Sequence, residues 1–352
     1  MEQQIQFCTS SDGVRIAYAT VGQGPALVCP PPWVSHLEVE WQWPTRRAFW
    51  ERLAQRHTVV RYDRYGCGLS DRERTDFSLD ADLRPLEAVV DHLELRRFAL
   101  LSIAQAGPHA IAYAVKHPER VSHLILFDSY GSRGRIDPAQ QQTLDAMQTL
   151  AGAHWEFACK TMACAFIPGA DAADQEGFAR LLSESETGEM AVQLIEHDRR
   201  TNVVDLLPRV GVPTLVMHRR EDPIIAFHLG REMAASISNA RFVPLEGNSH
   251  NFNSGDAEAV LRAISEFLSE PSQPRLAAPP YTDGLTGREV EVLGLIAAGQ
   301  SNQEIAEELV LSVRTVERHI TNTYGKIKAR GRADATAYAL AHGLAQTPPY
   351  VV

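Results

Sequence analysis

Apolar and polar positions along the first 270 residues follow two alternating patterns. Short apolar runs, many of them β-branched, predict buried strands, and longer stretches with apolar residues three or four positions apart predict amphipathic helices. The predicted strands are residues 14–21, 26–29, 58–62, 98–101, 123–127, 213–218 and 241–245. The predicted helices are residues 45–56, 79–93, 108–117, 227–237 and 256–268. Strands that alternate with helices predict an α/β domain with a mostly parallel sheet.

Two segments interrupt this alternation. Residues 137–207 have a helical pattern with Met and Phe, and such an excursion between two strands predicts a helical cap over a pocket. Residues 269–284 contain four prolines, which predicts an extended linker over about 271–284. We therefore expect one domain over residues 1–270 and a smaller one over 285–352, whose apolar pattern is helical.

The composition is that of an ordinary globular protein, with 44% hydrophobic and 22% charged residues. No apolar stretch approaches the roughly 20 residues that span a bilayer, and the N-terminus lacks a signal-peptide pattern. The five cysteines form no C-x-x-C pair, so free thiols in a reducing compartment are expected. These features predict a cytoplasmic protein, associated with the nucleoid if it binds DNA, without a membrane partner, a metal or a cofactor.

The charge distribution changes this picture for one segment. A net charge of −10 argues against nucleic-acid binding by the chain as a whole. Residues 312–332, however, carry six Lys and Arg residues and a single acid, Glu317. Such a basic segment is the electrostatic footprint of a phosphate-binding surface. A solvated helix face is the alternative interpretation.

Three motifs in the first domain have the order of a catalytic site. Residues 62–71 read YDRYGCGLSD, Asp222 follows the predicted strand 213–218, and His250 ends the sequence GNSH after the last predicted strand. Together they resemble the D-x-R-G-x-G-x-S turn, the acid-bearing strand end and the histidine loop of the α/β-hydrolase fold. The resemblance covers roughly residues 1–270. It implies an α/β-hydrolase-like, mostly parallel sheet with a helical cap.

The nucleophile position departs from that family. Its elbow sequence, G-x-S-x-G, falls on residues 102–106, which read SIAQA and place Ala104 in the serine slot. A methyl group cannot attack a carbonyl, so His250 has no hydroxyl to deprotonate there. Ser102 lies two residues too early, on the strand, to replace it. We therefore expect a non-catalytic domain, and we expect Ala104→Ser alone to restore little, since Ser102 and Ala106 replace the glycines that permit the strained turn.

The rest of the degenerate site is a candidate ligand pocket. The resemblance places the two amide donors of an oxyanion hole at Gln105 and at or near Trp33, and backbone amides bind an oxygen whatever their side chain. Four of the five tryptophans lie within residues 33–50. Some serve core packing, and we expect others to line a pocket. The predicted ligand-binding residues are Trp33, His36, Ala104, Gln105, Trp155, Phe166 and His250.

The C-terminal segment carries the most specific pattern in the chain. Thr286 and Glu289 have capping-box spacing at the start of a first helix, residues 299–309 have the pattern of a turn and a scaffold helix, and Ser312 precedes a further helix that reads VRTVERHI. This order resembles the LuxR-type helix-turn-helix. The resemblance implies a small all-α domain that binds double-stranded operator DNA.

A recognition helix places its N-terminal residues at base edges in the major groove and its cations on phosphates. On that geometry Arg314, Thr315 and Arg318 are the expected base readers, and Val316 is shared between the domain core and a thymine methyl. The family usually has lysine where this chain has Glu317. The predicted DNA-binding residues are Arg314, Thr315, Val316, Arg318, His319, Lys326 and Lys328.

A homodimer is expected because a single module of this size makes few base contacts. The resemblance places the dimerising helix at about residues 332–343. Ala335, Ala339 and Leu340 would give that helix a narrow apolar face.

Three functions remain open at this stage. The first is a transcriptional regulator whose hydrolase-like domain binds a small, partly apolar effector without turning it over. The second is an active enzyme that uses the pair His250 and Asp222 as a base and carries a DNA-binding appendage. The third is a constitutive regulator with an inert first domain. Ala104 favours the first over the second, and the aromatic pocket and cap disfavour the third.

Overall fold

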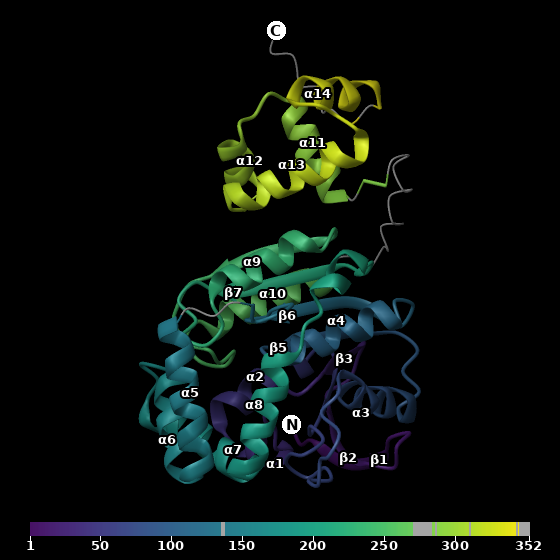
Figure 1. Cartoon of the computed structure of the whole chain (residues 1–352). Coiled ribbons are helices and arrows are strands. Elements are labelled where there is room, and N and C mark those ends of the chain that lie inside the picture. Colours follow the sequence, from purple (N-terminus) through teal and green to yellow (C-terminus); the bar gives the residue numbers. More distant parts are fainter. Residues whose placement is uncertain (135–137, 270–283, 286, 310, 343, 345–352) are drawn as a thin grey trace.

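The computed structural model describes residues 1–134, 138–269, 284–285, 287–309, 311–342 and 344. These residues form a helix-flanked sheet and a C-terminal group of helices (Figure 1). The predicted linker, residues 271–284, lies outside the described ranges apart from Gly284. No helix formed by the described residues is both long and apolar enough to cross a membrane.

The sheet has eight strands in the order β1-β2-β4-β3-β5-β6-β7-β8. The strands are β1 (Gln4–Thr9), β2 (Arg15–Val21), β3 (Ala26–Cys29), β4 (Thr58–Tyr62), β5 (Phe98–Ile103), β6 (Val121–Phe127), β7 (Thr214–Arg219) and β8 (Ala240–Leu245). From β4 to β8 all neighbours are parallel, and β2 pairs antiparallel with both β1 and β4. The mostly parallel sheet predicted from the apolar runs is thus confirmed. The edge strand β1 was not predicted, because most of its residues are exposed and it has no apolar run.

Side chains along each central strand alternate between two cores, one on each face of the sheet. In β5, Leu101 and Ile103 enter one core, and Phe98 and Leu100 enter the other. The helices α2 (Pro44–Ala54) and α10 (Ala257–Ser269) pack into the first core. The helices α3 (Leu79–His92), α4 (Ala106–Lys116) and α9 (Phe227–Ser236) pack into the second. A further short helix, α1 (Leu37–Gln42), precedes α2.

A group of helices separates β6 from β7 in the chain. They are α5 (Pro138–Ala153), α6 (Trp155–Phe166), α7 (Ala172–Ser185) and α8 (Gly188–Arg200). The short helix η1 (Val204–Arg209) then returns to the sheet, where Leu207 joins the core beneath α4 and α9. The excursion therefore ends at α8, a few residues before the predicted boundary at 207.

The C-terminal helices are α11 (Gly287–Ala297), α12 (Asn302–Glu308), α13 (Val313–Ile327) and α14 (Arg332–Ala341). They share a small core that includes Val292, Ile305, Val316 and Ala335, each fully buried. The helix α12 begins with a capping box, in which Ser301 and Glu304 each bond the other's backbone amide. The capping box predicted at Thr286 lies outside the described residues.

Candidate functional site

Ala104 occupies the sharp turn between β5 and α4. Its φ is +50°, in the left-handed region that residues other than glycine rarely adopt, and it is 2% exposed. Its amide donates to the Phe127 carbonyl over 2.9 Å, and its own carbonyl accepts the Ser129 hydroxyl over 2.7 Å. The strained elbow implied by the family resemblance is therefore formed around an alanine.

The residues that replace the two elbow glycines fit this turn. Ser102 in β5 and Ala106 at the start of α4 are both fully buried. Glycine is needed one position later, since a methyl group on Gly107 would overlap the Ser129 hydroxyl. The expectation that Ser102 and Ala106 prevent the turn is wrong, because the close backbone approach occurs at Gly107.

The acid and the histidine of the predicted triad are in hydrogen-bonding position. His250 Nδ1 lies 2.8 Å from Asp222 Oδ2 and 3.1 Å from Oδ1. Asp222 is fixed in turn by the amides of Ile224 and Ile225, which donate to its Oδ1 over 2.7 and 3.0 Å. Burial disfavours the charged carboxyl, but His250 and these donors outweigh it and hold the pKa of Asp222 below its ordinary value. The dyad can thus orient a base at His250 Nε2.

Two cavities adjoin the elbow. One, of about 40 Å³, is lined by Ala104, Gln105 and His250, and by Phe178 and Leu181 of α7 among others. The second, of about 50 Å³, lies under the excursion helices and shares Trp33, Gln105 and Phe166 with the first. Ser102 lines neither cavity, which removes it as a substitute nucleophile.

Five of the seven predicted ligand-binding residues line these cavities: Trp33, Ala104, Gln105, Phe166 and His250. The other two lie elsewhere. His36 is the N-terminal cap residue of α1 and is not part of either lining. Trp155 stands behind Trp33, with ring centroids 6.4 Å apart, and donates through Nε1 to the Glu186 carbonyl. Neither side chain lines these cavities, so a role in ligand binding stays a prediction for His36 and Trp155.

The sequence prediction missed the three charged residues of the second cavity, Arg133, Asp198 and Arg199. None belongs to a recognisable motif. Arg133 follows β6, and Asp198 and Arg199 lie on α8. Their proximity depends on how α8 packs against the sheet domain, so no local pattern identifies them.

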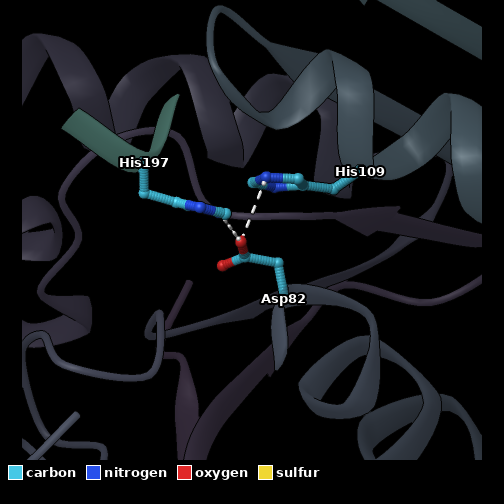
Figure 2. A group of neighbouring side chains, drawn as sticks. All are labelled: Asp82, His109 and His197. Atoms are coloured by element: carbon cyan, nitrogen blue, oxygen red, sulfur yellow. Dashed lines mark hydrogen bonds and ion pairs between the residues drawn. The ribbon is translucent and has the colours of Figure 1, made fainter. Parts of the chain in front are cut away.

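A buried polar network joins α8 to the sheet domain beside this cavity (Figure 2). Asp82 of α3 contacts two rings, His197 Nε2 of α8 at 2.6 Å and His109 Nε2 of α4 at 3.3 Å. Arg64 bonds Asp82 on one side and pairs with both oxygens of Asp198, at 2.8 and 3.1 Å, on the other. All of these side chains are buried. The network therefore holds α8, which carries Asp198, against α3 and α4.

This network has the residue types of a metal site, but its electrostatics do not suit a cation. Asp82 Oδ1 already accepts from Arg64 and Arg74, at 3.1 and 2.9 Å, so two guanidinium groups lie beside the place a metal would occupy. A second group of possible ligands is Asp128, His218 and Asp222. There His218 Nε2 faces the Ile225 carbonyl at 2.8 Å, so that nitrogen carries a proton and cannot bind a metal. We assign both groups to structural hydrogen bonding.

The helix α13 presents the predicted base readers to solvent. Arg314 and Arg318 are exposed and Thr315 is half-buried. Its start is capped by Ser312, whose hydroxyl accepts the Thr315 amide over 3.1 Å. Lys328, at the C-terminal end of the helix, is also exposed. Among the described residues Arg314, Arg318 and Lys328 form no ion pair, so their charges are available to DNA phosphates.

Two other predicted DNA contacts, Val316 and His319, are corrected by the packing of α13. Val316 is 0% and His319 is 8% exposed, because both face the domain core. Burial and the nearby charges of Arg288 and Arg318 lower the pKa of His319 to about 4, so it is neutral at physiological pH. Lys326 pairs with the buried Glu289 over 2.7 Å, but its side chain is 37% exposed, so its phosphate contact stays a prediction.

The predicted dimer face of the last helix is also corrected. Ala335 and Ala339 are fully buried within the domain, whereas Leu340 is 64% exposed. The two alanines face α11 and the shared core because α14 packs there. They are therefore unavailable to a second copy.

Comparisons with known proteins agree with both halves of this description. The model of the alpha/beta hydrolase family matches residues 27–263, and that of the bacterial regulatory proteins of the luxR family matches residues 283–339. Non-heme chloroperoxidase CPO-A1 of Kitasatospora aureofaciens is 24% identical over 278 residues, which cover 75% of this chain and 99% of that protein. An esterase from Exiguobacterium antarcticum has the same fold, with a TM-score of 0.67 at 20% identity over 75% of this chain and 98% of that one.

Regulatory proteins match over a shorter stretch of the chain. The transcriptional regulatory protein LiaR of Bacillus subtilis (strain 168) is 47% identical over 85 residues, or 24% of this chain. The match spans 40% of LiaR, less than half of that protein. The chain belongs to the alpha/beta hydrolase family and carries at its C-terminus a DNA-binding domain of the LuxR family.

Proposed function

We propose that this protein is a ligand-responsive transcriptional regulator whose hydrolase-like domain binds a small, partly apolar molecule without hydrolysing it. The observation that carries the proposal is Ala104 at the elbow, beside a formed dyad and two cavities. A site with the turn, the base and the pocket but no nucleophile is suited to recognition rather than to acyl transfer. Its DNA partner is an operator in the nucleoid, which places the protein in the cytoplasm.

Support for an effector comes from the amides at the elbow as well as from the cavities. Among the described residues, neither the Gln105 nor the Trp33 amide donates a hydrogen bond to another backbone carbonyl. Both residues line both cavities. Such donors can hold a ligand oxygen even though no covalent intermediate follows.

We further propose that the regulator acts as a homodimer and that the ligand changes the arrangement of its two DNA-binding domains. A two-fold pair of recognition helices reads two half-sites, which gives more base contacts than one module can. A ligand shifts such an equilibrium only by its difference in affinity for the two arrangements, typically about 1–3 kcal/mol. Linkage then requires the operator to change ligand affinity by the same factor.

The test uses the full-length protein and an operator selected from a pool of random DNA duplexes. Calorimetry measures the affinity of a ligand found by thermal-shift screening, with and without saturating operator, and sedimentation gives the oligomeric state. We expect the ligand and the operator to change each other's affinity by the same factor, and we expect no turnover of 4-nitrophenyl butyrate. If the operator does not change the ligand affinity and the ligand does not change the operator affinity, the protein is a constitutive regulator.

A second candidate function is favoured by one observation, the intact dyad. His250 held at 2.8 Å by Asp222 could act as a general base on a water molecule or on an acidic C–H group without a covalent intermediate. This candidate predicts turnover of a substrate that is lost in His250→Ala and kept in Ser102→Ala. Binding without turnover across metabolite pools favours the regulator.

A further inference from the structure

Arg133 is a buried cation that faces a cavity without a carboxylate partner. It is 8% exposed and lines the second of the two cavities, under the excursion helices. Its guanidinium group lies 5.4 Å from the ring centroid of Tyr130. No carboxylate of the described residues lies within 4.0 Å of it, in contrast to most other buried arginines of the domain. Burying an unpaired charge is costly, so the counter-charge is expected from whatever fills the cavity.

The two other charged residues of this lining, Asp198 and Arg199, are already neutralised by residues outside it. Arg64 pairs with both oxygens of Asp198, and Asp145 pairs with Arg199 over 2.9 Å. Gln148 also accepts from Arg199 over 2.9 Å. Among the described lining residues, Arg133 therefore leaves one positive charge facing the cavity.

The rest of the lining is mainly apolar. Leu144 and Met147 come from α5, Met162 and Phe166 from α6, and Ile195 from α8. Methionine side chains are flexible and adapt to ligands of different shape. A cavity with one fixed cation and an apolar body is complementary to a molecule with one anionic end.

We propose that this cavity binds a small monocarboxylic acid with an apolar body, whose carboxylate pairs with Arg133 and whose body lies among the side chains of α5, α6 and α8. The inference rests on the proposed function, because it names the ligand class of the same site. A planar guanidinium group matches a carboxylate through two parallel hydrogen bonds. A second carboxylate at the far end would be buried among apolar side chains and is disfavoured.

The experiment compares matched probes on the full-length protein by calorimetry. Decanoate is set against 1-decanol and against the diacid decanedioate, and 4-phenylbutyrate is set against 4-phenylbutanol. We expect at least one of the two monoacids to bind roughly 10- to 100-fold more tightly than its alcohol, the range of a hydrogen-bonded charge pair. We expect the diacid to bind more weakly than decanoate.

Variants then assign this preference to one residue. Arg133→Gln should abolish the preference for acid over alcohol and leave binding of the alcohol itself. Arg133→Lys keeps the charge without the planar fork and should give an intermediate preference. Arg200→Gln removes a charge from an exposed position on α8, where the side chain is 80% exposed, and should change nothing. Circular dichroism and a melting curve check that each variant is folded.

Three results would overturn the inference: equal affinity for acid and alcohol, an acid preference that survives Arg133→Gln in the folded protein, or no binding of either monoacid at millimolar concentration. The regulatory role is judged separately, from operator affinity. Acid binding through Arg133 with unchanged operator affinity upholds the ligand class and contradicts the proposed function. An operator response to an uncharged ligand only, with no preference for acid over alcohol, upholds the proposed function and contradicts the ligand class.

Discussion

The hydroxyl of Ser129 donates a hydrogen bond to the carbonyl oxygen of Ala104 over 2.7 Å, although the two residues lie 25 positions apart in the chain. With the bond from the Ala104 amide to Phe127, it holds the elbow against the end of β6. The turn is therefore stabilised by the neighbouring strand as well as by its own sequence. This explains how Ala104 keeps a φ of +50° without glycine at position 102 or 106.

Ala104→Ser should convert the site into a weak hydrolase. The new hydroxyl would lie at a formed elbow, in the cavity that His250 also lines. We expect slow turnover of 4-nitrophenyl butyrate and covalent labelling by a fluorophosphonate probe, both absent from the unmodified protein. Adding His250→Ala should reduce the rate by about 100-fold or more, as expected for loss of a general base. Labelling that does not depend on His250 would contradict this account of the dyad.

Gly107→Ala should destabilise the hydrolase-like domain. The added methyl group would overlap the Ser129 hydroxyl, and relief of that overlap must displace the backbone of α4 or break the bond to Ala104. We expect a loss of about 2–3 kcal/mol in the free energy of unfolding, measured by urea denaturation. The control, Ala106→Gly, removes a methyl group at the adjacent position and should cost about 1 kcal/mol. Equal costs would show that the close approach at Gly107 is unimportant.

His109 should make the domain less stable in mild acid. Burial lowers the pKa of His109 to about 4, below the value of about 6.5 expected in the unfolded chain. Between these two values the unfolded state binds a proton that the folded state does not, so stability falls as the pH is lowered. The expected contribution between pH 7 and pH 5 is about 2 kcal/mol.

The comparison of variants isolates this contribution from that of other titrating groups. Between pH 7 and pH 5, the free energy of unfolding of His109→Gln should fall by about 2 kcal/mol less than that of the unmodified protein. Urea denaturation at each pH measures this difference. His228→Gln, at an exposed position on α9, should follow the unmodified protein. If the two variants have the same pH dependence, His109 is not the group responsible.

Arg318 and Lys328 should contribute to DNA binding in different ways. Arg318→Ala should cost about 1–3 kcal/mol on the selected operator and relax the preference at one base pair. Lys328→Ala should weaken binding to all sequences alike and reduce the salt slope by about one. Fluorescence anisotropy at several salt concentrations measures both effects, with Arg200→Ala in the other domain as the charge-matched control. Unchanged affinity in both variants would mean that α13 does not contact DNA through this face.

Local sequence predicted much of the architecture. A short apolar run at residues 98–101 predicted the strand β5, and helical periodicity predicted α3, α4 and α10. The positions of Asp222 and His250 followed from strand ends, since the carboxyl ends of parallel strands meet at one edge of a sheet. The capping serine Ser312 and the pattern after it predicted α13. All of these signals lie within one element or its immediate flank.

The sequence by itself determined the two domains, the degenerate nucleophile position and the basic recognition helix, because these depend on residue type and on short-range periodicity. Only the tertiary structure decided that the elbow forms around Ala104, that His319 faces the core, that Lys326 pairs with Glu289, and that Arg133 faces the cavity. Each of these depends on a contact between separate elements, and on which way a side chain points once those elements have packed. Where a residue type suits both the core and the surface, neither the residue type nor the local periodicity tells which way its side chain points.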